Sequence, residues 1–323
     1  MREVLVIGGS RYFGRLLVTL LQEAGSRVTV VNRGSPPPAG VGHLVADRDD
    51  EAALRAACGP RTFDVVIDQV CYTPAQAEVA CRVFADRVGR YVMTSTMEVY
   101  DPATSPGGLP AVPGVPVVED AVRPADWPVR PDLPWHDPDR LATVFDPATG
   151  YAEGKRQAEA MFTRSAPFRY ASVRSAHVLG GGARDFTGRL AHYVERVTAG
   201  QPVAVHPDPL PTSFIQEREI AEFLRWAAAA DFVGPVNATS HGELTAIELC
   251  DLVATRVGTP PRYQVVEDGP ASPFSFDRYY AMDNGRAERL GFRFGAVRDW
   301  LPTAIDDALA AREEDRHAVT RDR

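Results

Sequence analysis

The sequence has little of what marks several large classes of protein. Its four cysteines form no Cys-x-x-Cys pair, which argues against a disulfide framework or a zinc knuckle; they are Cys58, Cys71, Cys81 and Cys250. No apolar run approaches the ~18 residues of a membrane-spanning helix. Lysine and arginine total 35 against 43 aspartate and glutamate, and the formal charge of -8 excludes a generally basic nucleic-acid-binding protein.

The N-terminal residues also lack the pattern of a secretory signal. The apolar run at residues 4–7 is short and leads directly into Gly8, Gly9 and Arg11. We therefore expect a cytoplasmic protein in a reducing environment. We expect a small-molecule substrate, and no membrane, nucleic-acid or metal partner.

The composition is that of a globular protein with a sizeable core. Apolar residues make up 45% and charged residues 24% of the 323 residues, which suits one large domain or two small ones. In the first half, short apolar runs alternate with helical patterns, as in a parallel sheet that is covered on both faces. Strands are expected at residues 4–7, 28–31, 43–45, 63–67, 91–93 and 170–173, and helices at 13–24, 50–58, 74–86 and 150–164.

The second half is less regular. Helices are expected at residues 186–199, 220–230, 244–257 and 299–312, strands at 202–205 and 234–238, and a frayed tail from 313 to 323. The predicted fold class is α/β: a doubly wound parallel sheet over residues 1–174, followed by a smaller C-terminal substrate-binding region over 175–323. Some segments of that second region are expected to return to the sheet.

A glycine-rich turn connects the first strand to the first helix. Glycine there lets the backbone approach a pyrophosphate, and the helix N-terminus offers free N–H groups. We interpret the turn as the dinucleotide-binding loop of a Rossmann domain, because it follows a strand and opens a helix. A purely structural turn is the alternative. The expected cofactor contacts are Gly8, Gly9, Ser10, Arg11, Tyr12, Phe13 and Gly14.

The end of the second strand bears on which cofactor is bound. An acidic residue there would bind the adenosine ribose and repel a 2′-phosphate. This chain has Asn32 and Arg33 instead, and the Arg33 guanidinium suits a phosphate, which Arg11 can also approach. We predict NADP, with NAD as the alternative. A solvated turn for Arg33 is the competing interpretation.

A tyrosine and a lysine four residues apart suggest proton-transfer chemistry. Tyr151 and Lys155 lie one turn apart on the same face of the predicted helix. An ammonium beside a phenol favours the phenolate, and a hydroxyl from Thr96 or Ser95 can orient a substrate oxygen. The three residues Tyr151, Lys155 and Thr96 are therefore the predicted catalytic set for proton transfer coupled to hydride transfer.

These motifs resemble the extended branch of the short-chain dehydrogenase/reductase superfamily, the NAD(P)-dependent epimerase/dehydratase family, in an atypical bacterial subgroup. The resemblance covers nearly the whole chain. It implies that Tyr151 is the acid/base, that Lys155 holds the nicotinamide ribose and lowers the tyrosine pKa, and that Thr96 binds the reacting oxygen. Further cofactor contacts are expected from Asp47, Val70, Thr94 and Ser175.

Several positions depart from the pattern of that family. Sugar-nucleotide 4,6-dehydratases have Thr-Asp-Glu where this chain has Thr96, Met97 and Glu98, and methionine cannot donate the proton that expels a hydroxyl. Glu98 is either a second acid/base or a plain polar residue. Thr212 replaces an arginine that grips a diphosphate in nucleotide-sugar epimerases, and His177 replaces an asparagine. These changes weaken the case for a nucleotide diphosphate. His177 is either a substrate contact or a buried structural histidine.

Residues 101–149 contain 11 prolines and no clear periodicity. Because they connect the Thr96 strand to the Tyr151 helix, they are expected to lie over the active site. Trp127, Trp135 and His136 would then line an apolar substrate pocket. A packed surface excursion is the alternative.

The sequence thus predicts an NAD(P)-dependent oxidoreductase or epimerase, with a ketoreductase as the main interpretation. The alternatives are a sugar or nucleotide-sugar epimerase/dehydratase that retains its cofactor, and a non-catalytic NADP-binding regulatory protein. The resemblance also implies a homodimer in which the helices at residues 74–86 and 150–164 pair across a two-fold axis.

Overall fold

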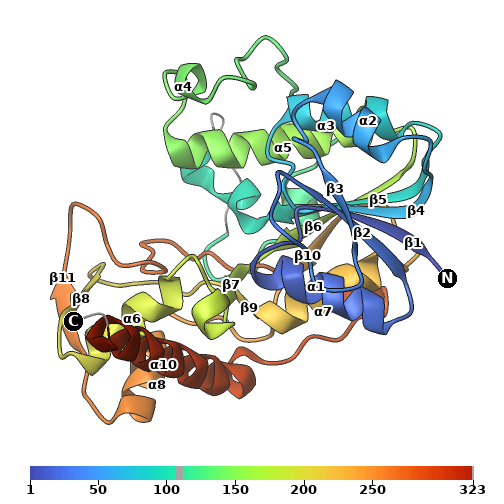
Figure 1. The fold of residues 1–323 in the computed structure, drawn as a ribbon. Coiled ribbons are helices and arrows are strands. Elements are labelled where there is room, and N and C mark those ends of the chain that lie inside the picture. Colours follow the sequence, from blue (N-terminus) through green and yellow to red (C-terminus); the bar gives the residue numbers. More distant parts are fainter. Residues whose placement is uncertain (106–111, 322–323) are drawn as a thin grey trace.

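A seven-stranded parallel sheet forms the centre of the computed structural model, which describes residues 1–105 and 112–321, with side chains as far as residue 314 (Figure 1). The strand order is β10-β6-β5-β4-β1-β2-β3. The strands are β1 (Glu3–Ile7), β2 (Arg27–Asn32), β3 (Gly42–Val45), β4 (Phe63–Asp68), β5 (Val88–Thr96), β6 (Arg169–Ser175) and β10 (Gly234–Ala238). The predicted doubly wound α/β sheet is confirmed, and the order reverses between β1 and β4.

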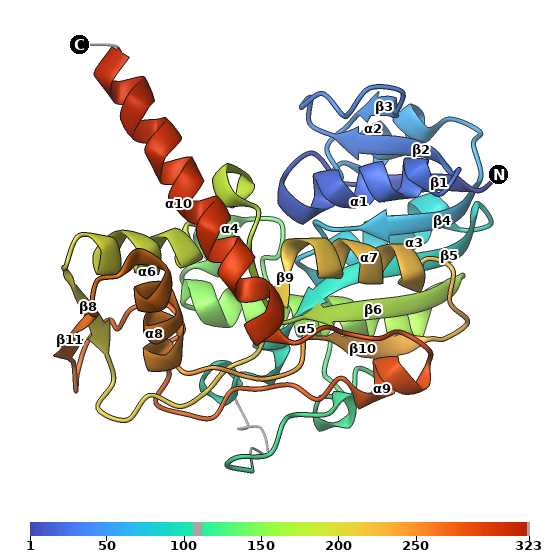
Figure 2. The same ribbon diagram turned by 90° about the horizontal axis from the view of Figure 1, so that it is seen from below.

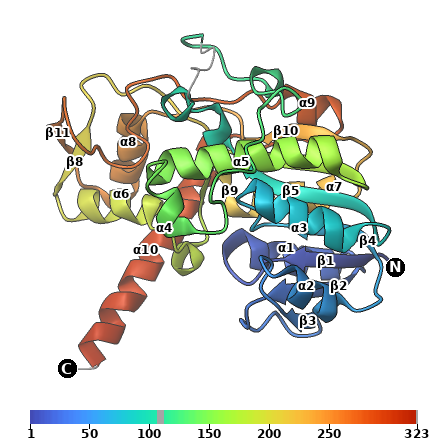
Figure 3. The ribbon, with the colours of Figure 1, turned by 90° about the horizontal axis from the view of Figure 1, so that it is seen from above.

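Helices cover both faces of this sheet. One face carries α1 (Tyr12–Glu23) and α7 (Glu217–Ala227), and the other carries α2 (Glu51–Cys58), α3 (Pro74–Phe84) and α5 (Pro147–Ser165) (Figures 2 and 3). Strand β1 is apolar from Val4 to Ile7 because both of its faces are buried. Val4 and Val6 pack with Leu17 on the first face, whereas Leu5 packs with Val79 on the second, because successive side chains alternate.

A second, smaller lobe faces the carboxyl ends of the strands (Figure 1). It contains α6 (Arg189–Thr198), α8 (Ala246–Val257) and α10 (Val297–Arg321), packed around a separate core that includes Leu190, Tyr193, Leu249 and Leu301. Two short sheets join it: β8 (Pro202–Val205) pairs with β11 (Arg262–Val265), and β7 (His177–Leu179) pairs with β9 (Phe214–Gln216). Helix α9 (Gly285–Arg289) lies beside β10.

The structure corrects several predicted boundaries. Helix α6 begins at Arg189 rather than at residue 186, because Gly188 adopts φ 63° immediately before it. The tail expected to fray from residue 313 continues α10 as far as Arg321. The strands β7, β9 and β11 were not predicted; each has only three or four residues. Within the described ranges no helix is long and apolar enough to cross a membrane.

The proline-rich segment follows a path set by two buried arginines. In its described part it contains only short helical turns, among them α4 (Pro138–Leu141). Arg156 of α5 donates to the carbonyl oxygens of Val99 at 2.8 Å, Asp101 at 3.1 Å and Thr104 at 2.9 Å. Arg174 of β6 donates to the carbonyls of Glu119 at 3.0 Å and Val122 at 2.8 Å. These bonds give partners to backbone groups that a helix or sheet would otherwise pair.

The same segment covers the outer side of α5. The indole N–H of Trp127 donates to Glu153 at 3.2 Å, and the Gln157 side chain accepts the backbone N–H of Arg130 at 2.7 Å. Residues 152–160 are all buried, so the middle of α5 is enclosed, whereas residues 147–151 and 163–165 at its two ends are exposed or half-buried. The chain itself therefore covers the middle of the face through which a dimer was expected to form.

Candidate active site

A cavity of about 760 Å³ opens at the carboxyl ends of β1, β4, β5 and β6. This is where the strand order reverses, the position at which doubly wound sheets bind ligands. Four of the predicted cofactor and substrate contacts do not line it: Gly14, Trp127, Trp135 and His136. Those that do are Gly8, Gly9, Ser10, Arg11, Tyr12, Phe13, Asn32, Arg33, Asp47, Val70, Thr94, Thr96, Glu98, Tyr151, Lys155, Ser175 and His177.

The glycine loop leaves the N-terminus of α1 open toward this cavity. Gly8 and Gly9 have φ of 94° and 77°, and a Cβ on Gly9 would lie 2.8 Å from Val6 Cγ1. No side chain of the described residues caps the helix, so its first N–H groups stay available to an anion. Gly14 has a packing role, since a Cβ there would lie 3.0 Å from Gly9 Cα.

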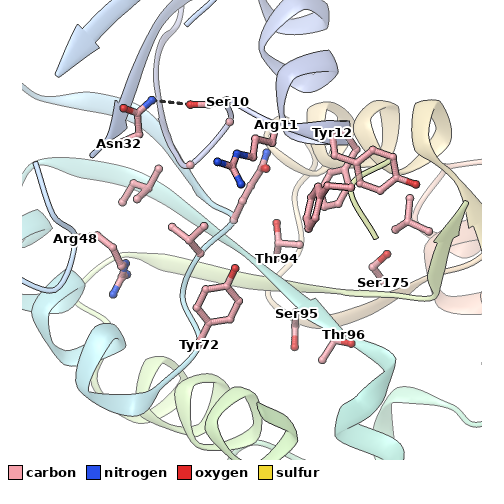
Figure 4. Close-up of a pocket in the computed structure, with 18 of the residues that line it drawn as sticks. Ser10, Arg11, Tyr12, Asn32, Arg48, Tyr72, Thr94, Ser95, Thr96 and Ser175 are labelled. Carbon is pink, nitrogen blue, oxygen red and sulfur yellow. Dashed lines mark hydrogen bonds between the residues drawn. The ribbon is translucent and has the colours of Figure 1, made fainter. Parts of the chain in front are cut away.

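At the end of β2, the Asn32 side chain is fixed by hydrogen bonds to Ser10, Gly34 and Ser35. Its amide donates to Ser10 Oγ at 2.6 Å and to the Ser35 carbonyl at 2.7 Å, while its oxygen accepts the Gly34 N–H at 2.8 Å. Arg33 follows with an exposed side chain. Figure 4 shows Arg11 extending from the glycine loop into the space above Thr94. Arg33 therefore lies at the end of β2 without a carboxylate at position 32, and Arg11 lines the same cavity.

Tyr151 and Thr96 meet on the opposite side of the cavity. Thr96 Oγ accepts the backbone N–H of Glu98 at 3.2 Å, which leaves the hydroxyl proton free to donate. Burial raises the pKa of Tyr151 above its ordinary value, and a hydrogen bond with Thr96 opposes that shift. Tyr151 is therefore a neutral phenol near pH 7, the form that donates a proton.

The Lys155 ammonium lies beside the rings of Tyr72 and Tyr151. It donates to the Thr94 carbonyl at 2.8 Å and lies 4.5 Å from the ring centroid of Tyr72 and 5.9 Å from that of Tyr151. Lysine is the least common cation here: Lys155 is the single lysine among 35 basic residues. Burial lowers its pKa to about 8, with the nearby Cys71 and Asp68 acting in the opposite direction.

We expect this unusual lysine to be observable directly. In protein labelled with [ε-13C]lysine, the one side-chain signal should titrate with a midpoint near 8 rather than near 10.5. Because the folded pKa is lower than the unfolded one, burying the ammonium lowers the free energy of unfolding. This destabilisation is complete below pH 8 and disappears as the pH rises from 8 to 10.5. Lys155→Met should therefore stabilise the free protein by about 1–2 kcal/mol at pH 7. This figure allows for the hydrogen bond from Lys155 that the Thr94 carbonyl loses.

The measurement for the variant is chemical denaturation at two pH values. The stability difference between Lys155→Met and wild type should shrink between pH 7 and pH 10. A lysine signal that titrates near 10.5, or a variant that is less stable at both pH values, would contradict this account of the buried ammonium.

The cavity continues past Thr96 toward the second lobe. Glu98 accepts the Tyr280 hydroxyl at 3.0 Å, and burial raises the Glu98 pKa. His177 is 6% exposed, and burial together with Arg189 and Arg278 lowers its pKa well below the ordinary value. Thr212 is fully buried and its hydroxyl donates to the Tyr280 carbonyl at 2.7 Å, so it does not reach the cavity.

The structure corrects the role predicted for the aromatic residues of the proline-rich segment. Trp135 packs under α5, with its indole N–H donating to the Arg130 carbonyl at 2.8 Å and its ring 6.2 Å from that of Phe145. Trp127 bonds to Glu153 on the same side of α5, and His136 does not line the cavity either. The described part of the segment turns outward over α5, as in the packed-excursion alternative, so these rings do not line this cavity. Residues 106–111 lie outside the described residues.

Three further residues of the cavity were missed from the sequence and matter for its chemistry. Tyr72 follows β4 and points into the cavity opposite Arg11 (Figure 4). Arg48 follows β3 and pairs with Asp68 at 2.5 Å, with most of its side chain buried. Arg189 opens α6. The position of Tyr72 just after a strand end was a usable signal; Arg189 comes from the second lobe and had none.

Comparisons with known proteins bear on the fold. UDP-glucose 4-epimerase from Thermus thermophilus, solved with NAD, matches with a TM-score of 0.70 and 19% identity over 95% of this chain and 98% of that chain. UDP-glucose 4-epimerase from Thermotoga maritima, solved with UDP-glucose, gives 0.71 and 17% over 94% and 98%. dTDP-glucose 4,6-dehydratase from Bacillus anthracis, solved with NAD, gives 0.72 and 13% over 97% and 98%.

No family model and no curated protein sequence matches the chain. At these identities the structural likeness establishes the fold. The resemblance to the epimerase/dehydratase group is thus confirmed for the architecture of the chain.

Proposed function

We propose that the protein is a nicotinamide-dinucleotide-dependent enzyme that acts at a carbon–oxygen centre of a small substrate, in the manner of an epimerase or dehydratase. The observation that carries this proposal is that Tyr151, Lys155 and Thr96 line one cavity with an uncapped glycine loop. The neighbours in the comparisons are epimerases and a dehydratase, which favours this alternative over the ketoreductase predicted from the sequence. A regulatory protein would have no need of the three catalytic residues.

The residues of the cavity suit a nicotinamide dinucleotide. Several buried polar atoms have no partner within the described ranges: the Tyr12 hydroxyl, Gln69 Nε2, Thr94 Oγ and Ser95 Oγ. Such atoms are costly unless a ligand or water satisfies them. The glycine loop and α1 would hold the pyrophosphate, and Lys155 the nicotinamide ribose. The bound cofactor would supply a hydride acceptor and donor.

The protein side of the reaction is proton transfer at the substrate oxygen. The neutral Tyr151 phenol donates its proton to that oxygen when a carbonyl is reduced, and the resulting phenolate, which the Thr96 hydroxyl stabilises, takes a proton back when a hydroxyl is oxidised. An epimerase or dehydratase returns its hydride to the same substrate, so its cofactor can stay bound, whereas a reductase must release it.

Cofactor retention provides the test. Mass spectrometry of the small molecules released on denaturation should find close to one nicotinamide dinucleotide per chain. If none is released, calorimetry with added NADPH and NADH decides. Binding of neither cofactor would refute the proposal. Rapid exchange of the cofactor, with stoichiometric consumption of NADPH, would instead support the ketoreductase interpretation.

We further propose that NADP is preferred over NAD, although neighbours were solved with NAD. The support is the missing acid at Asn32 and the exposed Arg33 beside it. Arg33→Ala should weaken NADPH binding by about 1–3 kcal/mol, the scale of a charge-assisted contact, and leave NADH binding nearly unchanged. Calorimetry with both cofactors measures this. An equal loss for both would show that Arg33 does not contact a 2′-phosphate.

We propose a single chain in place of the homodimer expected from the sequence, because the middle of α5 is covered. Because residues 152–160 are buried by the chain's own segment, pairing through α3 and α5 would require that segment to move. We expect light scattering to give the mass of one chain at micromolar concentration. A dimer whose α5 amides gain protection from hydrogen exchange on association would overturn this expectation.

A further inference from the structure

The Lys155 ammonium is buried without a counter-ion of its own in the described part of the chain. Lys155 is 2% exposed, and one of its three N–H groups donates to the Thr94 carbonyl at 2.8 Å. The other two have no hydrogen-bond acceptor among the described residues. Asp68, an acid near it, accepts Arg48 at 2.5 Å and the Tyr91 hydroxyl at 2.6 Å instead. A buried charge in this state is costly unless another group stabilises it.

The face of the Tyr72 ring is the group that lies against this charge. The ammonium stands over that ring, 4.5 Å from its centroid, whereas the centroid of the Tyr151 ring is 5.9 Å away. The face of an aromatic ring carries negative charge, and its attraction for a cation is larger where the cation is shielded from water. Tyr72 therefore presents an electron-rich surface to the lysine inside the cavity (Figure 4).

The chain fixes the backbone of Tyr72 from two sides. Its N–H donates to Gln76 Oε1 at 2.5 Å, and the Gln76 amide donates to Asp49 at 2.6 Å. Its carbonyl oxygen lies against α5 at Gly154, where a Cβ would collide with that oxygen. Gly154 immediately precedes Lys155, so the missing side chain lets the segment after β4 approach the helix right beside the lysine. The contact between ring and ammonium is thus set by two elements packed together.

We propose that Tyr72 is a positioning residue, whose ring face holds the Lys155 ammonium in place and in its charged form beside the Tyr151 phenol. This inference rests on the proposed function only for the role that it gives to Lys155. A neutral amine cannot favour the Tyr151 phenolate. Burial lowers the Lys155 pKa to about 8, so the charge of the lysine near neutral pH depends on the contacts that favour the ammonium.

The other titratable groups near the ammonium have partners or are neutral. Asp68 pairs with Arg48, and Glu159 pairs with Arg174. Burial raises the pKa of the Cys71 thiol to about 12, so it carries no charge near pH 8. A substitution at position 72 leaves these groups in place, so its effect on the lysine reports on the ring.

A series of rings at position 72 tests the proposal in protein without cofactor. Tyr72→Phe and its mono-, di- and trifluorinated analogues keep the shape of the ring, while fluorine withdraws negative charge from its face. In protein labelled with [ε-13C]lysine, the signal of the single lysine should titrate at progressively lower pH, by about one pH unit over the series. The same series at Tyr263, on β11 of the second lobe, should leave the midpoint unchanged. A midpoint that stays constant or rises along the position-72 series would overturn the proposal.

The pH dependence of turnover extends the test to the reaction. Activity that requires the ammonium is lost as the pH rises through the Lys155 midpoint, so the high-pH limb of kcat/KM should move to lower pH in the trifluorinated variant. Tyr72→Phe should keep the limb of wild type, because it keeps the ring face. A limb that stays in place while the lysine titration shifts would overturn the positioning role.

The two proposals can fail separately. The lysine titration needs neither cofactor nor substrate, so a shift along the series supports the ring contact even if the protein binds no dinucleotide. Conversely, an unchanged titration would refute the role of Tyr72 and leave the proposed function intact.

Discussion

Tyr151→Phe should lower turnover by roughly 10²–10⁴-fold, the range typical of losing one acid/base group, while cofactor affinity stays the same. The substitution keeps the ring that packs 6.1 Å from Tyr72 and removes only the hydroxyl. In the free protein that hydroxyl is protonated, because burial raises its pKa, and so it can donate to a substrate oxygen. Single-turnover kinetics with a substrate in hand, together with calorimetry of the cofactor, measure the two quantities separately.

Three variants serve as controls for this prediction. Thr96→Val should lower turnover with little effect on cofactor binding, whereas Lys155→Ala should damage both. Tyr72→Phe keeps the ring beside the Lys155 ammonium and should change turnover much less than Tyr151→Phe. Turnover of Tyr151→Phe within a factor of about three of wild type would transfer the proton-carrying role to Glu98 or His177.

Glu159→Ala should destabilise the protein by about 3–5 kcal/mol, the cost of leaving one member of a buried ion pair without its partner. Glu159 and Arg174 are both 0% exposed, and their closest contact is 2.6 Å. Without the carboxylate, the Arg174 guanidinium would remain charged in the core. Because Arg174 also binds the carbonyls of Glu119 and Val122, hydrogen exchange around residues 117–123 should accelerate as well.

The matched control is an ion pair on the surface. Asp306→Ala removes the partner of Arg256, and both side chains of that pair are more than 40% exposed. Water and salt screen such a pair, so its loss should cost less than about 1 kcal/mol. Denaturant unfolding of both variants gives the comparison. Equal effects would mean that the Glu159 carboxylate is replaced by water in the core.

The sheet could be predicted because its signals are local. Strands buried on both faces have continuous apolar sequences, and Asp50, an aspartate at the start of the predicted second helix, caps it by accepting the Ala53 N–H. β7 and β9 were missed because three residues carry no periodicity, and their pairing of His177 with Phe214 joins positions far apart in the chain. The sequence left two paths open for the proline-rich segment, because its path depends on distant arginines.

In the candidate site, too, residues placed by local sequence signals could be predicted and residues placed by long-range contacts could not. The glycine loop, Thr96 and the Tyr151–Lys155 pair follow from spacing along single elements, and all of them except Gly14 line the cavity. Arg189 comes from the other lobe, so only the tertiary fold brings it to His177. One sequence signal was available and unused. In a chain whose other cations are all arginine, a solitary lysine marks a position where a guanidinium, with its higher pKa and flat shape, cannot substitute.

The arginines that hold the proline-rich segment bind its main chain. The bonds that Arg156 and Arg174 make to this segment go chiefly to carbonyl oxygens, which every amino acid provides, so the path of the segment depends little on which side chains it carries. Substitutions along it are therefore expected to be tolerated, apart from the residues that pack on α5, whereas a change at either arginine should release the whole stretch. In evolutionary terms, the segment can diverge in sequence while the active site beside it keeps its shape.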